Sequence, residues 1–303
     1  MKYEPEGVNP ALLKKFYSVK DLKAADESRE ICEGRVVLCD SRHNLYVDLG
    51  GFRGVIMRTE GALGIFEGTQ KDIALLSRVN RTVCFCVKGL HRENGELVPV
   101  LSRRSVQLRC KREYIDKLNE GDIIDAKITR LESFGAFIDI GCGLNSLIPV
   151  DMLSVSRINH PKERVFEGQL IKAVLKKREA HKLTFSLREL LGTWEENAAR
   201  FSVGETVTGV VRSVESYGVF IELAPNLAGL AEYEGELFAG QKVSVIIKSM
   251  SPERLKIKLS VIEAFNEKAT PTGLEYYLDS GNISEWRYSP AGSLKQITTV
   301  FGK

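Results

Sequence analysis

The sequence lacks long hydrophobic runs, and its apolar stretches are far shorter than the ~20 residues that a membrane-spanning helix needs. Its first residues, Met1 to Pro5, contain no apolar segment like that of a secretory signal peptide. We therefore expect a cytoplasmic protein without a membrane partner.

Motifs of catalysis and metal binding are also missing. There is no HExxH, phosphate-binding loop, GxSxG or paired-carboxylate spacing, and no nucleophile has a base nearby. The six cysteines include no CxxC pair with a matching second pair, so we expect buried free thiols and no zinc site. The sequence thus predicts a protein that is not an enzyme and that needs no metal or cofactor.

An overall excess of basic charge is the last missing feature. The chain has 43 basic and 40 acidic residues, a net charge of +3. Any basic surface for nucleic acid therefore has to be local. With 43% apolar residues in a length of 303, the chain is long enough for two or three globular domains.

What the sequence does contain is a repeated segment. An aromatic, a glycine, a small residue and a second aromatic recur after 83 residues (217 minus 134), first within 133–139 and then within 216–222. The glycines allow the backbone to bend, as a strand of a small barrel must. Side chains of a strand alternate between its faces, so two rings three positions apart cannot both follow one core stripe. At least one ring of each pair is expected outside the core or at a bend.

The two ring pairs are Phe134 with Phe137 and Tyr217 with Phe220. Exposed rings beside basic side chains suit stacking against nucleic-acid bases. The alternative is that the rings belong to the core and that the repeat reflects duplication alone. That alternative is stronger for Phe137 and Phe220, because an isoleucine follows each of them and one of each neighbouring pair must face inward.

Runs with strand character indicate three five-stranded domains, at 31–105, 119–188 and 202–262. In the middle copy the strands are expected at 122–132, 134–140, 145–149, 170–177 and 182–187, with a short helix after the third strand and residues 176–178 in the turn before the last. The last strand of the third copy is expected at 254–260. A helical arm at 1–30 precedes them, a polar linker at 106–118 and a helical linker at 189–201 join them, and an aromatic-containing tail at 263–303 follows. Within the arm, Ala11 to Lys23 has helical spacing, with Asn9 as cap and Pro10 at the first helical position. Part of the tail is expected to pack or to order on binding.

Five short strands, a glycine-marked second strand and an insert after the third strand describe an OB-type barrel. The repeats resemble the RNA-binding domain named after bacterial ribosomal protein S1, whose pattern includes Phe-Gly-Ala-Phe, then Gly-Leu-Val-His-Ile-Ser, and a final Arg-Ile-x-Leu-Ser strand. The matching segments are 134–137, 146–151 and 183–187 in the middle copy, 217–220, 229–233 and 257–260 in the third, and 46–50 and 101–104 in the first. The resemblance implies an all-β fold of three tandem OB barrels with short helical linkers and an N-terminal helical arm.

The sequence departs from the family pattern in two places. Pro149 and Glu232 stand where the family commonly has a histidine that joins the RNA face, which lowers the affinity expected of each copy. The first copy lacks the first aromatic and the glycine, and Tyr46 is its one ring in this segment. Since N-terminal copies in the family tend to dock on the ribosome or on proteins, we expect the first copy to do so.

Basic side chains are expected around the rings. In the last strand of the third copy Leu255, Ile257 and Leu259 alternate with basic residues, so the apolar set fills the barrel and the basic set points outward. The ordinary alternative is a solvated basic edge that deters aggregation. The residues predicted to bind RNA are Phe134, Phe137, Lys176, Lys177, Arg178 and Lys182 in the middle copy and Tyr217, Phe220, Lys248, Arg254, Lys256 and Lys258 in the third.

The resemblance implies an RNA-binding protein of translation that holds single-stranded mRNA near the small ribosomal subunit. The first copy or the N-terminal arm is the candidate for docking. An accessory protein of RNA decay or stress response, acting off the ribosome, is the alternative. A nuclease would need a separate catalytic domain, for which no stretch is long enough, and a protein scaffold with inactive barrels is the remaining possibility.

Overall fold

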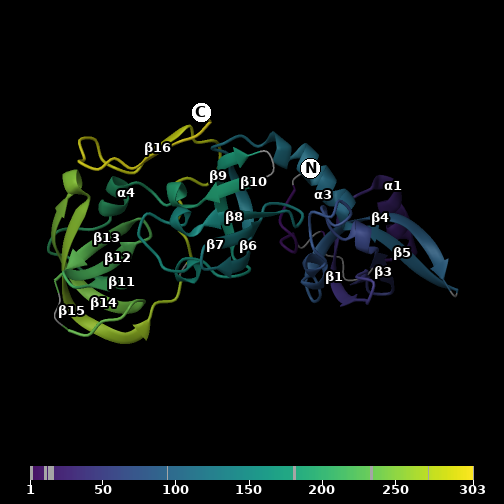
Figure 1. The fold of residues 1–303 in the computed structure, drawn as a ribbon, viewed down its shortest axis with the longest axis horizontal. Coiled ribbons are helices and arrows are strands. Elements are labelled where there is room, and N and C mark those ends of the chain that lie inside the picture. Colours follow the sequence, from purple (N-terminus) through teal and green to yellow (C-terminus); the bar gives the residue numbers. More distant parts are fainter. Residues whose placement is uncertain are drawn as a thin grey trace. The chain divides into compact units, whose positions relative to one another are not determined.

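The computed structural model describes residues 3–9, 12, 17–93, 95–179, 182–232, 235–271 and 273–302. Strands dominate these ranges, and they close into three five-stranded barrels (Figure 1). In each barrel the first strand pairs with the second and fourth, and the third strand pairs in parallel with the fifth. This is the strand order of the OB fold, so the predicted fold class is confirmed.

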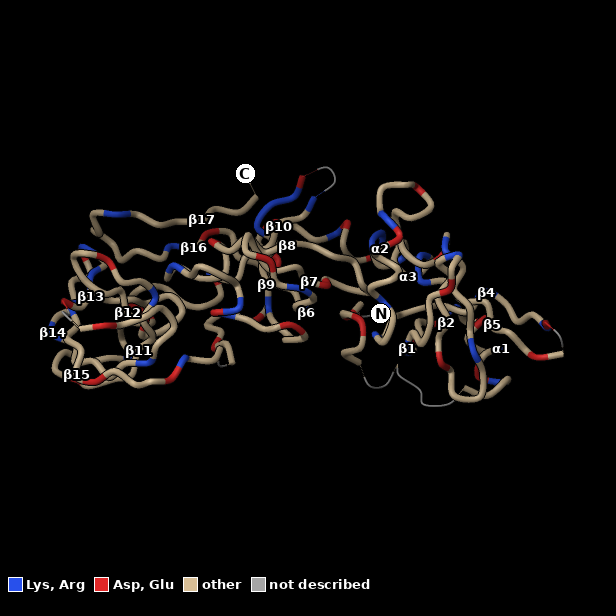
Figure 2. The backbone as a smooth tube through the Cα atoms, turned by 60° about the horizontal axis from the view of Figure 1, so that its bottom comes forward, with Lys and Arg blue, Asp and Glu red and all other residues tan. Residues whose placement is uncertain are grey.

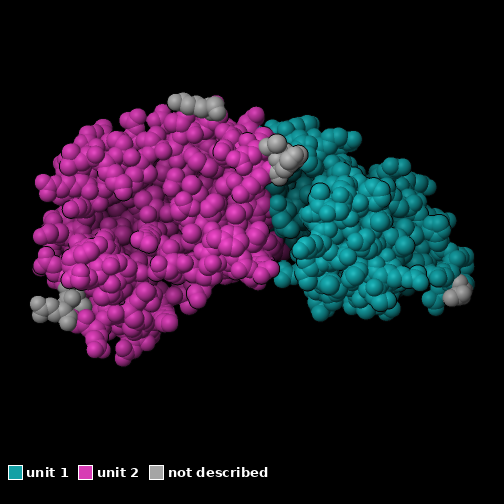
Figure 3. Space-filling model, viewed as in Figure 1, with its two compact units in different colours: residues 1–118, 139–145 teal, residues 119–138, 146–303 magenta. Residues whose placement is uncertain are grey.

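The described chain divides into two compact units, residues 1–118 with 139–145 and residues 119–138 with 146–303 (Figure 3). The first barrel lies in the first unit, and most of the second barrel and all of the third lie in the second unit. The division into three domains that we predicted is kept as a proposal.

The first barrel is built around a core of buried aliphatic side chains and Phe85. Its strands are β1 (Cys32–Cys39), β2 (Leu45–Asp48), β3 (Arg53–Ile56), β4 (Thr82–Glu93) and β5 (Glu96–Ser102). The insert after β3 holds η1 (Arg58–Glu60) and α2 (Ile73–Leu76), and β5 leads into α3 (Arg103–Glu113) and η2 (Ile115–Lys117).

The N-terminal helix α1 runs over Val19–Ser28 rather than from Ala11. Ser18 and Asp21 form a reciprocal capping box at its start, which is a stronger start signal than the Asn9 and Pro10 that we had weighed. Leu22 and Ala25 are buried in the core of the first barrel, so the arm packs on its own domain. Residues 10, 11 and 13–16 of the predicted helix lie outside the described residues.

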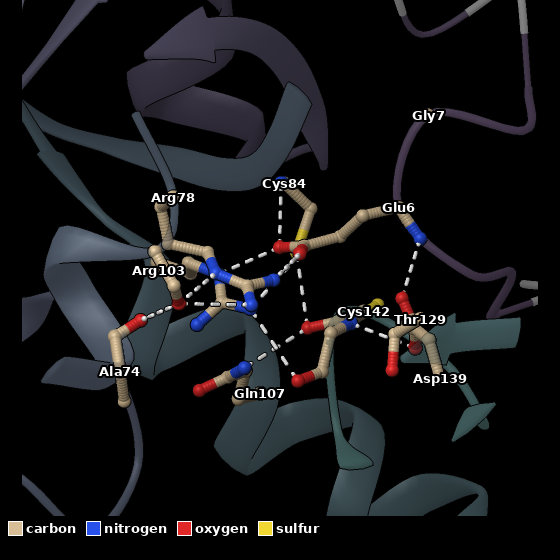
Figure 4. Close-up of polar contacts among 12 residues, drawn as sticks. Glu6, Gly7, Ala74, Arg78, Cys84, Arg103, Gln107, Thr129, Asp139 and Cys142 are labelled. Atoms are coloured by element: carbon tan, nitrogen blue, oxygen red, sulfur yellow. Dashed lines mark hydrogen bonds and ion pairs between the residues drawn. The ribbon is translucent and has the colours of Figure 1, made fainter. Parts of the chain in front are cut away.

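Ahead of this helix, the segment around Glu6 is held inside the first unit (Figure 4). Glu6 is buried and accepts two hydrogen bonds from Arg103, at 2.6 and 2.9 Å, and one from the Cys84 amide at 3.1 Å. Burial alone would raise the pKa of Glu6, but Arg103 and Arg78 outweigh it and hold this pKa below its ordinary value. No local sequence pattern indicates this ion pair, because its partners lie almost 100 residues apart.

The second barrel closely follows the strands expected from its sequence. It comprises β6 (Ile123–Glu132), β7 (Gly135–Asp139), β8 (Asn145–Pro149), β9 (Leu170–Glu179) and β10 (Lys182–Ser186). The insert after β8 contains η3 (Val150–Met152) and η4 (Pro161–Glu163), the short helix that we predicted there. One detail differs: residues 176–178 belong to β9, where Lys177 pairs with Thr184, and do not form the turn that we expected.

The third barrel follows η5 (Arg188–Leu190) and the linking helix α4 (Trp194–Ala198). Its strands are β11 (Thr206–Glu215), β12 (Gly218–Ala224), β13 (Leu227–Ala231), β14 (Gln241–Ser251) and β15 (Lys256–Lys268). The last strand is longer than expected because it stays paired with β14 as far as Gln241 opposite Lys268, through three irregularities of register. Arg254 precedes it in η6 (Pro252–Arg254).

Buried ion pairs join the second and third barrels inside the second unit. Glu222 of β12 accepts hydrogen bonds from Arg164, at 2.8 and 2.6 Å, and from Arg212, at 2.9 and 3.0 Å. Arg164 belongs to the insert of the second barrel and Arg212 to β11 of the third. Close by, the buried amide of Asn226 donates to the carbonyl oxygens of Arg188 and Gly192, both at 2.8 Å. The two barrels therefore form one packed body.

The C-terminal segment also connects these two barrels (Figure 1). Its strands β16 (Glu285–Arg287) and β17 (Thr298–Val300) pair with each other, and Trp286, Tyr288 and Phe301 join the core cluster of the third barrel. The Tyr288 carbonyl accepts from the Trp194 amide at 3.0 Å. The tail that we expected to pack does so within the second unit.

Candidate nucleic-acid interface

The rings of the middle copy lie on the outside of the second barrel. Phe134 sits in the turn between β6 and β7 and is 56% exposed, while Phe137 on β7 is half-buried. Their ring centres are 5.9 Å apart at an interplanar angle of 87°, an edge-to-face arrangement. Ile138 is the residue that points inward, with no exposed surface.

The third barrel repeats this geometry. Tyr217, in the turn between β11 and β12, is 64% exposed, and its ring lies 6.2 Å from that of Phe220 at 88°. Phe220 is half-buried and Ile221 is fully buried. Within each repeat the isoleucine therefore occupies the core, which removes the core interpretation that we had considered strongest for Phe137 and Phe220.

The glycine between the two rings is required for close strand packing. A Cβ atom on Gly135 would lie 2.4 Å from the carbonyl oxygen of Ile148, and one on Gly218 would lie 2.7 Å from that of Ala231. Both contacts are far inside van der Waals distance. The missing side chain lets the second and third strands approach each other directly beneath the exposed ring.

Strand register places a lysine on the outer face of the third barrel that carries Phe220. Phe220 is opposite Leu230 on β13, and Leu230 is opposite Lys258 on β15. Side chains in register on neighbouring strands share a face, so the lysine follows the ring at about 10 Å, two strand spacings. A ring and a cation at this separation can contact a base and a phosphate of one strand.

The other residues of the third barrel that we predicted to bind RNA lie at the turn of the β14–β15 hairpin. Lys248 and Lys256 are exposed on the two strands, and Arg254 is exposed in η6 between them. No carboxylate pairs with any of these, or with Lys258, among the residues that the structure describes. The C-terminal segment reaches this end, where the Leu294 amide donates to the carbonyl oxygen of Glu253.

The second barrel uses its basic residues differently. Leu147, Thr184 and Lys177 form the corresponding row, so the outward lysine comes from β9 and pairs with Glu179 at 2.8 Å. Lys182 is exposed at the start of β10. The hairpin of β9 and β10 is the longest basic stretch of this barrel (Figure 2).

One of the predicted cations of this hairpin already contacts a ring, and a second is half-buried. The Lys176 ammonium lies 5.0 Å from the centre of the Phe301 ring, and its pKa is lowered, mainly by burial. Arg178 is half-buried, with its amide donating to Glu120 at 2.7 Å. The contact with Phe301 could not be predicted, because nothing in the sequence indicates where the C-terminal segment packs.

The first barrel presents a different outer row. Tyr46, which corresponds to Phe137 and Phe220, is opposite Leu38 and Val55, and Val55 is opposite Val100. Val100 stands where the third barrel has Lys258. Leu38 is 45% exposed, so this face is apolar and without charge along the row.

Three OB barrels, two of which expose matching edge-to-face ring pairs, define a tandem OB-repeat protein. Residues 117–187 match the family model described as the S1 RNA binding domain. The second barrel therefore matches the S1 domain family.

The chain is similar to known proteins over more than this domain. The chain is 33% identical over 222 residues to small ribosomal subunit protein bS1 of Staphylococcus aureus, a match that covers 66% of this chain and 56% of that protein. It is 30% identical over 188 residues to bS1 of Rhodopseudomonas palustris, covering 58% and 33% of the two chains. The chain thus spans about half the length of the first of these relatives, and a third of the second.

Among solved structures, a multidomain protein with nucleic acid binding domains from Streptococcus pneumoniae aligns over 77% of this chain and 73% of its own, at 14% identity and a TM-score of 0.24. We draw nothing from a similarity of that size. Within the described ranges, every helix is too short or too polar to traverse a lipid bilayer.

Proposed function

We propose that the protein binds single-stranded RNA through the outer faces of its second and third barrels and acts in translation. The observation that carries this proposal is the duplicated ring pair, of which one ring in each barrel is exposed. In the third barrel a lysine lies in register on the same face. Rings stack on any base, so recognition would be largely independent of sequence. The chain would act as a binding protein and not as an enzyme.

The proposed RNA-contacting residues divide by role. Phe134, Phe137, Tyr217 and Phe220 stack bases, and Lys177, Lys182, Lys248, Arg254, Lys256 and Lys258 contact phosphates. We place Lys176 and Arg178 at the margin of the RNA-contacting site, because Lys176 already contacts the Phe301 ring and Arg178 is half-buried.

The place in translation rests on the relatives, which are named as small ribosomal subunit proteins. They favour this role over RNA decay off the ribosome. Docking on the small subunit would fall to the first barrel, because its row of Leu38, Tyr46, Val55 and Val100 is apolar and suits a protein surface. The arm is a weaker candidate, because α1 buries Leu22 and Ala25 in its own barrel. A cytoplasmic location follows from the proposed role.

The stacking faces are tested by replacing one exposed ring in each barrel of the full chain, Phe134→Ala with Tyr217→Ala. Each stacked base contributes about 1–3 kcal/mol, so we expect affinity for oligouridine to fall by about tenfold or more. Fluorescence anisotropy at fixed salt measures it. Phe166→Ala removes another exposed phenylalanine of the second barrel, outside the ring pair, and should leave affinity unchanged. Equal affinity of the double variant and Phe166→Ala would overturn the proposal.

A further inference from the structure

The first unit contains a basic cavity that the RNA-binding faces do not use. It has a volume of about 500 Å³ and lies between α3, the end of α1 and β4. Basic side chains dominate its lining, and the single acidic one, Asp116, is paired with Lys111 at 2.7 Å. The lining residues are Arg29, Cys86, Lys88, Ser105, Leu108, Arg109, Lys111, Arg112 and Asp116.

The central cation of this cavity is incompletely satisfied. Arg109 donates from Nη1 to the carbonyl oxygen of Arg29 at 2.7 Å. Its Nε and Nη2 atoms are buried and have no hydrogen-bond partner in the described structure. Burying the hydrogen-bond donors of a cation without acceptors costs free energy. The two unpartnered nitrogens therefore point to a missing acceptor.

The neighbouring cations are also free to bind. Neither Arg29 nor Lys88 has a carboxylate partner among the described residues, and Lys88 is exposed. Arg112 pairs with Glu113 at the exposed end of α3. Three uncommitted cations therefore converge on one cavity of a chain whose net charge is only +3.

The chemistry of the lining selects a phosphate group. The Nε and Nη2 donors lie on one edge of a planar guanidinium, and this fork matches two oxygens of a phosphate. No aromatic side chain is among the lining residues, so a base has nothing to stack on. Because both nitrogens are covered by neighbouring side chains, these must shift for an anion to reach them.

We propose that this cavity, the α3 cavity, is a phosphate-binding site in which Arg109 forms the two-oxygen contact and Arg29 and Lys88 supply further charge. The phosphate could belong to an RNA backbone or be a free anion, and the chemistry is the same for both. The site lies in a different unit from the ring pairs and is independent of base stacking.

The test follows backbone amide signals of Lys88, Leu108 and Arg109 in the isotopically labelled full chain by NMR. One titration uses inorganic phosphate at constant ionic strength, with chloride as reference. A second uses oligouridine with the Phe134→Ala, Tyr217→Ala variant, so that failure of the stacking proposal does not affect the result. We expect saturable shifts confined to the α3 cavity.

Variants decide whether the shifts arise from this site. Arg109→Gln and Lys88→Gln should each weaken binding by about tenfold, the value of one charged hydrogen bond. Lys88 is exposed, so its variant keeps the proposal testable if Arg109→Gln does not fold. Lys117→Gln removes a charge from η2 outside the cavity and should change nothing.

The two titrations also distinguish the two possible sources of the phosphate group. Saturation with oligouridine alone supports an RNA backbone as ligand, and saturation with inorganic phosphate supports a free anion. Shifts that match those of chloride, or that survive Lys88→Gln at full strength, would overturn the proposal.

Discussion

Asp139 and Glu222 occupy the same position in two copies of one repeat, 83 residues apart (222 minus 139), and both are buried. Their surroundings differ. Burial, followed by the charge of Glu6, raises the pKa of Asp139 to about 6, although three backbone amides donate to it. Burial alone would also raise the pKa of Glu222, but Arg164 and Arg212 lower it. The carboxyl group at this position of the repeat therefore has a raised pKa in one copy and a lowered pKa in the other.

Glu222→Gln should destabilise the second unit by about 3–5 kcal/mol at pH 7, because it leaves two buried guanidinium groups without their counter-charge. Urea unfolding followed by tryptophan fluorescence measures this change, since Trp194 and Trp286 both lie in the second unit. Glu263→Gln, at an exposed site on β15, is the matched control. A loss no larger than that of the control would show that the ion pairs contribute little.

The same carboxylate gives this stability a pH dependence of known sign. The pKa of Glu222 in the folded protein lies below the ordinary value of 4.5, so its contribution is complete above pH 4.5 and is lost as pH falls through the lower folded value. The difference in unfolding free energy between the wild type and Glu222→Gln should therefore shrink on acidification below pH 4.5.

For single residues, the sequence predicted the exposure of the rings better than it predicted the partners of the charged side chains. The spacing of Phe134 and Phe137 already required one ring outside the core, because side-chain alternation is a local rule. The partners of Lys176 and Glu222 depend instead on how distant segments pack. No local pattern contains that information, so the contacts with Phe301 and Arg164 were missed.

Among the elements, the second strand of each aromatic copy depends on its first residue. Gly135 starts β7 directly against the backbone of β8, and its backbone is outside the left-handed region that only glycine favours. The need for glycine here is therefore one of space.

Gly135→Ala should destabilise the second unit by about 1–3 kcal/mol, since the new methyl group meets a carbonyl oxygen that cannot move without breaking strand pairing. Thermal or urea unfolding by tryptophan fluorescence gives the value. Gly273→Ala adds the same methyl group in the second unit, at a place where nothing lies within 4 Å, and should be nearly neutral. Equal stability of the two variants would mean that β7 and β8 can separate freely.

Element bounds were predictable where hydrophobic alternation was regular. The strands of the second barrel agree with expectation to within about two residues, and β6 alternates cleanly between core and surface. The errors fall where a tertiary contact or a capping box sets the end of an element. The strand β15 continues along β14, and α1 begins at Val19, directly after its N-cap Ser18.

For the whole molecule, the three barrels share one topology but offer different surfaces. The row through Phe220 ends in Lys258, whereas the row through Tyr46 ends in Val100. Under the proposed function, the second and third barrels bind RNA and the first barrel binds a protein surface.

We predict that the full chain co-sediments with small ribosomal subunits and that Leu38→Glu weakens this association while oligouridine affinity is kept. A carboxylate on the apolar row would have to be desolvated in the docked state. The charge change Lys117→Glu, away from this row, is the control. Co-sedimentation unaffected by Leu38→Glu would exclude this row as the docking surface.

The hydrogen bonds of the buried Glu222 carboxylate and of the Asn226 amide hold the second and third barrels together in one unit. The distance between their ring pairs is thus built into the fold and is not set by a flexible tether. A nucleotide strand too short to bridge that gap can occupy one pair only, whereas a longer strand reaches the next pair without any cost of aligning two loose domains. Binding to the second unit would consequently depend on the length of the strand, although no particular base is recognised.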